Sequence, residues 1–199
     1  MLASAPVSAQ TRTSLLPTEV GANDLFGSSV ALDGDYAVIG SPDDDDKGTN
    51  MGAVYIYHWN GIAWVQQSKV LSPDGRGGRF GLAVAIEDDH IVVGTTSGGL
   101  GTGEGRAYVF RLTGETWTHV KTLSASDRRM DGHFGISVAI SGDRILVGAE
   151  NGGKSTDSDV QTGAAYVFER HLGGVDNWGF RQKLNASDET SGQNFGQAV

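Results

Sequence analysis

The chain has 199 residues, a formal net charge of −9 and no cysteine. The lack of cysteine excludes disulfides and thiolate metal sites, and the acidic balance argues against nucleic-acid binding, which needs a basic surface. No stretch reaches the eighteen or more apolar residues of a transmembrane helix, so we expect no membrane insertion.

The first ten residues stand apart from the patterned sequence that follows. They include small residues spaced as Val7-x-Ala9, which resembles a signal-peptidase site, but they lack a charged start and a full apolar stretch. Residues 1–10 are therefore interpreted either as a simple tail or as the remnant of an export signal.

Four Phe-Gly dipeptides divide the rest of the chain into similar segments. They begin at Phe26, Phe80, Phe134 and Phe195. The regular spacing between these dipeptides indicates a repeat architecture. We place the units at about residues 26–79, 80–133 and 134–194, followed by a partial unit at 195–199.

Each complete unit contains four strand signals, which the second unit illustrates. Residues 80–86 alternate large apolar and small side chains, as in a strand whose small-residue face lies close to another backbone. Residues 91–94 form a continuous apolar run, typical of a strand buried on both faces. A third strand is expected at 107–110, and a fourth from Trp117 to Leu123.

No segment has a convincing helical period, so the predicted fold class is all-β. Asp33-Gly34 and Gly142-Asp143 fit tight hairpin turns between the first two strands. Four antiparallel strands per unit describe a β-propeller blade. We expect about three complete blades plus partial blades at both ends, the first of them a lone fourth strand near residues 11–17.

Three blades cannot close an ordinary propeller ring, which has about four to eight. The chain is therefore a piece of a longer protein, a subunit that completes a ring with other copies, or an open arc. Because exposed strand edges invite pairing with other chains, we expect self-association through the blade edges, giving a homo-oligomer.

The units resemble FG-GAP repeats, the blades of integrin-α-like β-propellers, over about residues 14–199. The Phe-Gly openings, Gly40-Ser41-Pro42 and residues 52–57 carry this resemblance. Bacterial-type FG-GAP repeats are more similar still, because residues 123–127 and 184–188 match their Leu-x-Ala-Ser-Asp stretch. The resemblance implies a secreted, extracellular or cell-surface adhesion module that binds or scaffolds and is not an enzyme.

An acidic loop is the candidate metal site. It contains four consecutive carboxylates and an amide, and the third unit offers a weaker parallel: Asp43, Asp44, Asp45, Asp46 and Asn50, with Asp157 and Asp159. Hard divalent cations prefer such oxygen ligands, so calcium is the expected ion if the loop is not simply solvated. The calcium loop of integrin repeats is not carried over, because the corresponding hairpins here are too short to wrap an ion.

Polar residues between the units form the second candidate site. In a propeller these linkers share a face with the loops between the second and third strands, where a protein or glycan ligand would bind. The candidate ligand-face residues are Arg76, Arg79, Asp127, Arg128, Arg129, Asp131 and His133, together with Trp59, which lacks an aromatic equivalent in the other units.

Two alternative functions remain open. One is a glycan-binding, lectin-like module, and the other is a propeller enzyme such as a hydrolase or lyase. The five histidines fall at unrelated places in the units, and no serine lies in a Gly-x-Ser-x-Gly motif. We therefore predict no catalytic residues.

Overall fold

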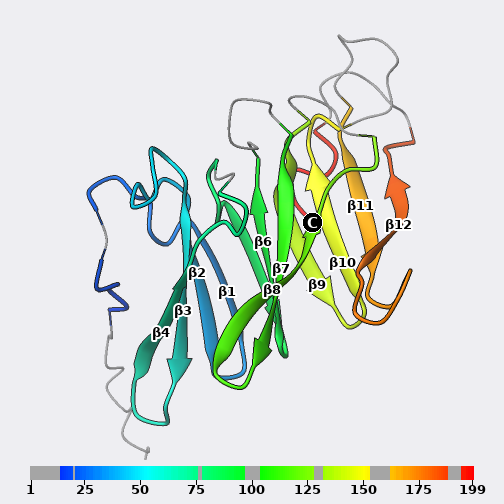
Figure 1. Ribbon diagram of the computed structural model, residues 1–199. Coiled ribbons are helices and arrows are strands. Elements are labelled where there is room, and N and C mark those ends of the chain that lie inside the picture. Colours follow the sequence, from blue (N-terminus) through cyan, green and yellow to red (C-terminus); the bar gives the residue numbers. More distant parts are fainter. Residues whose placement is uncertain are drawn as a thin grey trace, which may run out of the picture.

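The computed structural model describes residues 14–19, 21–75, 78–96, 104–127, 132–152, 162–187 and 194–199. These residues form three four-stranded antiparallel sheets that stand side by side (Figure 1), and a helix is not assigned in any of the described ranges. The predicted all-β class is confirmed. Within the same ranges there is no helix long and apolar enough to cross a membrane.

Each sheet is one blade, and its strands follow chain order. Blade 1 contains β1 (Ser29–Asp33), β2 (Tyr36–Ser41), β3 (Ala53–Trp59) and β4 (Trp64–Val70). Blade 2 contains β5 (Ala83–Glu87), β6 (His90–Thr95), β7 (Arg106–Thr113) and β8 (Thr116–Leu123). Blade 3 contains β9 (Phe134–Ser141), β10 (Arg144–Ala149), β11 (Ala164–Glu169) and β12 (Gly179–Leu184).

The strand register repeats from blade to blade. Val38 pairs with Ile56 across β2 and β3, and Val92 pairs with Val109 across β6 and β7. The third strand of every blade has a register shift against the fourth near its middle. The second and third strands are the most buried strands of each blade, and β6 is buried along its whole length.

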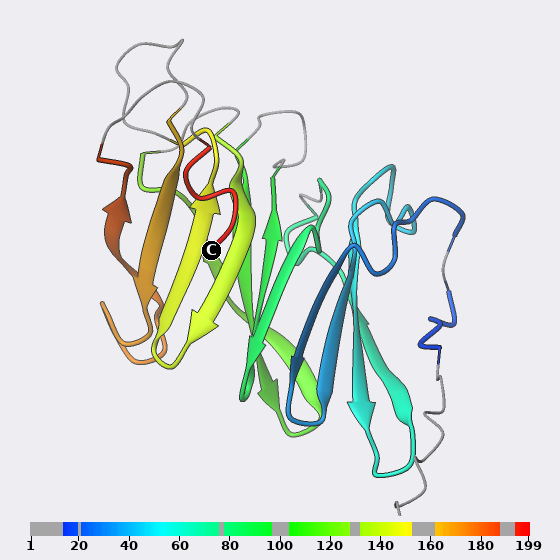
Figure 2. The same ribbon diagram turned by 180° about the vertical axis from the view of Figure 1, so that it is seen from behind.

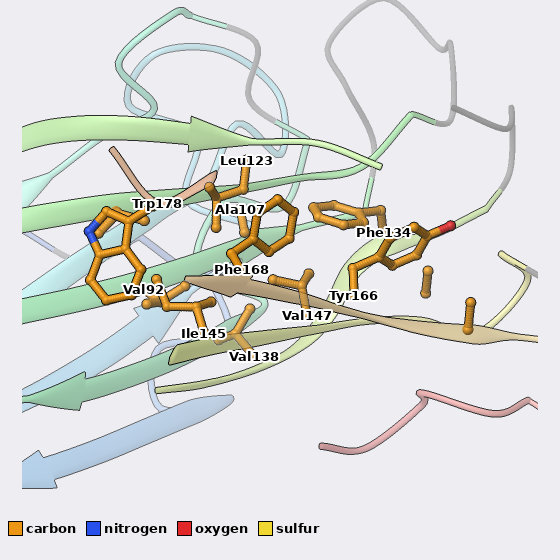
Figure 3. Packing of buried hydrophobic residues seen from close by; sticks show 13 residues of the cluster. Val92, Ala107, Leu123, Phe134, Val138, Ile145, Val147, Tyr166, Phe168 and Trp178 are labelled. Atoms are coloured by element: carbon orange, nitrogen blue, oxygen red, sulfur yellow. The ribbon is translucent and has the colours of Figure 1, made fainter. Parts of the chain in front are cut away.

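The hydrophobic core lies between the blades, since each blade covers one face of the next. The cluster between blades 2 and 3 combines Val92 and Val109 with Val147 and Phe168 (Figure 3). The equivalent cluster between blades 1 and 2 combines Val38 with Val93 and other residues. The first strands lie closest to the neighbouring blades, because Ala83 and Ala85 leave room for β9.

The recurring tryptophans belong to these interfaces. Trp117 and Trp178 are 7% and 1% exposed, and each packs in the cluster between its own blade and the preceding one. Trp64, at the start of blade 1, is only half-buried because the described residues place no blade in front of it. The interpretation of these residues as packing rather than sugar-binding platforms is supported by their burial.

The Phe-Gly dipeptide joins one blade to the next. The Phe80 ring is fully buried against Tyr108 of its own blade, with the ring centroids 5.5 Å apart. Its backbone forms a parallel bridge with Gly52 of blade 1. Gly81 follows with a φ of 90°, and a Cβ placed there would lie 2.5 Å from the carbonyl oxygen of Ala53. Only glycine fits this turn without strain or collision.

The same joint occurs at the C-terminal end of blade 3, as the view from behind shows (Figure 2). Phe195 bridges Gly163, and the carbonyl of Gly196 accepts a hydrogen bond of 2.8 Å from Ser137 Oγ. Phe195 is 36% exposed, since residues 194–199 contain no strand of its own blade to receive the ring. At the other end, residues 14–17 adopt no strand, although Leu15 packs on blade 1.

Candidate functional site: the loop face

One end of the three blades gathers the loops that differ most between the repeats. In each blade the second strand ends there and the third strand begins there. The linkers from one blade to the next lie at the same end. This end, at the top of Figure 1, is the loop face. It comprises the described parts of the loops 42–52, 96–105 and 150–163 and of the linkers 71–82, 124–133 and 185–194.

Asp44 is the buried centre of the acidic loop. Its side chain is 1% exposed, and its carboxylate lies 2.8 Å from Lys69 Nζ of β4. The same carboxylate accepts a hydrogen bond of 2.9 Å from the Tyr55 hydroxyl of β3. Burial would lower the pKa of Lys69, but hydrogen bonds to Asp44 and Asp46 outweigh it and raise that pKa. Lys69 is therefore a charged structural anchor for the loop.

The other three carboxylates of the loop also have protein partners. Asp46 binds Lys69, and Asp43 lies 3.1 Å from Arg79 Nε in the linker to blade 2. The Asp45 carboxylate accepts a hydrogen bond of 2.7 Å from the Asn50 backbone N–H. Repulsion between the four acids is thus relieved by cations and amides of the chain itself.

Calcium binding by this loop stays a prediction. Among the described residues, no group of three or more histidine or acidic side chains is arranged to hold a metal ion. Asp157 and Asp159 lie outside the described residues. The partners of Asp43 to Asp46 favour a loop that is held by its own ion pairs, because a cation would have to displace Lys69 from Asp44 and Asp46.

A tyrosine in the third strand of each blade fixes the linker that precedes the blade. The Tyr108 hydroxyl donates to Asp74, 2.9 Å away, and the Tyr166 hydroxyl donates to Asp127, 2.7 Å away. In blade 1 the Tyr55 hydroxyl reaches both the Glu19 carbonyl and Asp44. Burial is the main cause that raises the pKa of Tyr108 to about 12, so this hydroxyl remains a donor at neutral pH.

Asp127, predicted as a ligand-face residue, is part of this contact. Its second carboxylate oxygen lies 2.6 Å from Lys183 Nζ, whose ammonium also lies over the Tyr166 ring. Burial would raise the pKa of Asp127, but the hydrogen bonds from Lys183 and Tyr166 prevail and lower it. The aspartate of the Leu-x-Ala-Ser-Asp stretch thereby holds the linker against blade 3.

The other described ligand-face residues, Arg79, His133 and Trp59, have separate contacts. Arg79 is partly exposed beside Asp43, and His133 Nδ1 lies 2.7 Å from Glu150 Oε1. Arg76, Arg128, Arg129 and Asp131 lie outside the described residues. Trp59 does not join this face, since it ends β3 at the opposite end of blade 1, half-buried with its ring centroid 5.7 Å from that of Trp64.

A shallow pocket of about 370 Å³ opens on the loop face where blades 1 and 2 meet. It is lined by Lys47, Met51, Gly52, Leu71, Ser72 and Gly75. Sequence reasoning missed this pocket because its two walls come from a loop and a linker about twenty residues apart. The only signal in the sequence was Met51, an apolar residue at the end of a polar loop.

A charged network ties blades 2 and 3 together at the end opposite the loop face. Arg111 bridges Asp89 at 2.8 Å and Asp176 at 3.0 Å, and Asp176 also binds Arg170. His90, 3% exposed, lies beside Asp89, and its pKa is lowered mainly by burial. These titratable groups serve the joint between the blades, in contacts remote from the pocket.

Comparison with known families identifies the repeats. A sequence profile described as FG-GAP repeat matches residues 10–57, 64–110 and 117–168, which is well over half of the chain. Each match ends at the third strand of a blade, and the Phe-Gly joints lie inside all three. No curated protein matches the chain. The chain belongs to the FG-GAP repeat family.

Proposed function

We propose that the chain is an extracellular, non-enzymatic module that binds a protein or glycan through the loop face and associates with copies of itself. The observation that carries the proposal is a contrast within each repeat. The strands and Phe-Gly joints are nearly the same in all three blades, whereas the loops 42–52, 96–105 and 150–163 differ in length and sequence. A constant scaffold that presents variable loops is the usual design of a binding protein.

The contacts made by the titratable side chains of the loop face favour a binding function over catalysis. A catalytic acid, base or nucleophile needs a side chain that is free to reach a substrate. Asp44, Asp74, Asp127 and Lys69 are instead engaged with one another or with tyrosines of the third strands. The loop-face pocket contains one cation, Lys47, beside the apolar Met51 and Leu71. The pocket is therefore better suited to binding an acidic or apolar side chain of a peptide than to catalysis.

The partner is therefore proposed to be a protein at the cell surface or in the extracellular matrix. A glycan is the second candidate, and two arrays separate the classes: immobilised matrix proteins and immobilised glycans, both probed with the labelled full chain. We expect binding to a protein, and at least about tenfold weaker binding for the double variant Lys47→Glu, Met51→Asp, because a charge is reversed and another is placed in the pocket.

Ile62→Asp is the matched control. Ile62 is 86% exposed in the β3–β4 turn, at the end opposite the loop face, so this variant should bind as the unmodified chain does. A chain that binds neither array, or a pocket variant that binds as well as the control, would contradict the proposal. Binding to glycans alone would replace the protein partner by the lectin-like alternative.

A further inference from the structure

The same face of successive blades is covered by a following blade in two cases, and the described residues place no blade on it in the third. Val38 and Ile56 of blade 1 are 0% and 1% exposed because blade 2 lies on them, and Val92 and Val109 of blade 2 are both fully buried under blade 3. The residues at these positions in blade 3, Leu146 and Val167, are paired in the same register but only half-buried.

These residues belong to a mainly apolar patch on blade 3, which Ser141 and Arg144 also line. Together with Ala139 and Leu184 they line a shallow cavity of about 310 Å³, and we name these four residues the blade-3 outer face. In blade 2 the equivalent of Leu184 is Leu123, which is 1% exposed between the blades. The blade-3 outer face thus corresponds to the surface on which the next blade packs in blades 1 and 2.

Blade 1 presents the complementary face. Val84 and Ile86 of β5 pack against blade 1, and Val138, the first-strand equivalent in blade 3, is 8% exposed against blade 2. Their counterparts Val30 and Leu32 in β1 are 69% and 67% exposed. With Trp64, these two residues form the blade-1 outer face. Exposed apolar surface of this kind is typical of interaction sites.

We infer that these two faces meet between copies of the chain: the blade-3 outer face of one copy takes the blade-1 outer face of a second copy. The contact would continue the packing already seen twice within the chain. It is heterologous, since two different surfaces meet, so each copy keeps one of each face available for a further copy. This inference rests on the self-association included in the proposed function and specifies its geometry.

Two segments must move for the second copy to dock fully. One is residues 14–18, since Leu15 packs on blade 1 beside Trp64 of the blade-1 outer face, and the other is residues 194–199 on blade 3. Phe195 and Gly196 occupy on blade 3 the position that Phe80 and Gly81 occupy on blade 1, and the incoming Phe26-Gly27 turn requires that position. Phe26 is the stronger occupant, since its ring packs on Tyr55 of its own blade, with the centroids 5.3 Å apart, whereas Phe195 is 36% exposed. Residues 194–199 thus compete with the second copy.

The test measures molar mass against concentration by sedimentation, using the full chain. We expect the unmodified chain to associate, and we expect Val30→Asp alone or Leu146→Asp alone to weaken association by about 100-fold or more, because either places a charge in an apolar interface. An equimolar mixture of the two variants should again form dimers, since each supplies the face that the other has lost. Recovery on mixing also shows that both variants are folded.

Two further variants complete the test. Val175→Asp changes an apolar residue that is 87% exposed and outside both faces, and it should associate as the unmodified chain does. Gly196→Val should strengthen association, since a Cβ there would lie 2.1 Å from the Ala164 carbonyl oxygen and would displace the competing segment. A mixture that stays monomeric, or monomeric behaviour of both the unmodified chain and Gly196→Val, would overturn the inference and leave the faces to a different occupant. Ligand binding by the loop face does not enter this assay, so a monomeric result would remove self-association from the proposed function and leave its ligand-binding part to the array experiment.

Discussion

Two glycines in the same backbone conformation test how the blades are joined. Gly27 and Gly81 follow the phenylalanines of blades 1 and 2, with φ values of 89° and 90°. A Cβ at Gly27 would meet no atom within 4 Å, whereas a Cβ at Gly81 would lie 2.5 Å from the Ala53 carbonyl oxygen and 3.1 Å from Val54 Cγ2. Alanine at either position is equally strained in its backbone, but only at Gly81 does it strike a preceding blade.

The expected magnitudes follow from these two contributions. The unfavourable positive φ costs about 1–2 kcal/mol at either position. The collision at Gly81 adds about 1–3 kcal/mol, the usual cost of forcing atoms into a packed interior. Gly81→Ala should therefore reduce the free energy of unfolding by about 2 kcal/mol more than Gly27→Ala does. For a chain of this size the difference corresponds to roughly 4–8 °C in Tm.

Urea denaturation followed by tryptophan fluorescence, with thermal melting by circular dichroism, measures both variants against the unmodified chain. The ratio of the two effects matters more than either value, because the strain is common to both. Equal destabilisation by Gly27→Ala and Gly81→Ala would refute the reasoning. Equal losses would mean that the Phe-Gly turn does not pack tightly against the preceding blade.

Three further predictions concern burial, pH and metal. Phe80→Ala should lower the free energy of unfolding by about 3–5 kcal/mol because the ring is fully buried, and Phe195→Ala should lower it by less than about 1 kcal/mol. Denaturation measures both, and comparable losses would contradict the described packing. The pKa of His90 is lowered in the folded chain, so the unfolded chain takes up the proton first as the pH falls, and the Tm should decrease below about pH 6.5. His90→Phe should reduce this dependence of Tm on pH. An unchanged dependence would argue against a buried neutral imidazole. Because Lys69 and Arg79 already form ion pairs with Asp43, Asp44 and Asp46, millimolar calcium or a chelator should leave the Tm unchanged. A clear rise in Tm with calcium would instead establish binding to the folded state.

Much of the candidate site was beyond the reach of sequence reasoning. The run from Asp43 to Asp46 reads as a cation site when its neighbours in sequence alone are considered. The residues that form hydrogen bonds and ion pairs with these aspartates are Tyr55, Lys69 and Arg79. They come from later strands and a linker, and they contact the loop only when the sheet has formed. Asp127 is a similar case, since its partner Tyr166 lies 39 residues further along the chain.

The sequence by itself determined the number of repeats, the strands and the joints. These depend on local rules: alternation with a period of two, turn residues between strands, and a glycine wherever the backbone must turn with positive φ. The Phe-Gly spacing alone therefore located every blade.

Only the tertiary structure decided which equivalent residues are covered. Trp64 and Trp117 occupy the same place in their units, yet Trp117 is buried and Trp64 is half-buried. Blade 1 lies in front of Trp117, whereas the described residues place only the segment around Leu15 in front of Trp64. Val30 and Val84 differ for the same reason. Burial depends on the neighbouring blade, and the repeat pattern is identical whether or not that neighbour is present.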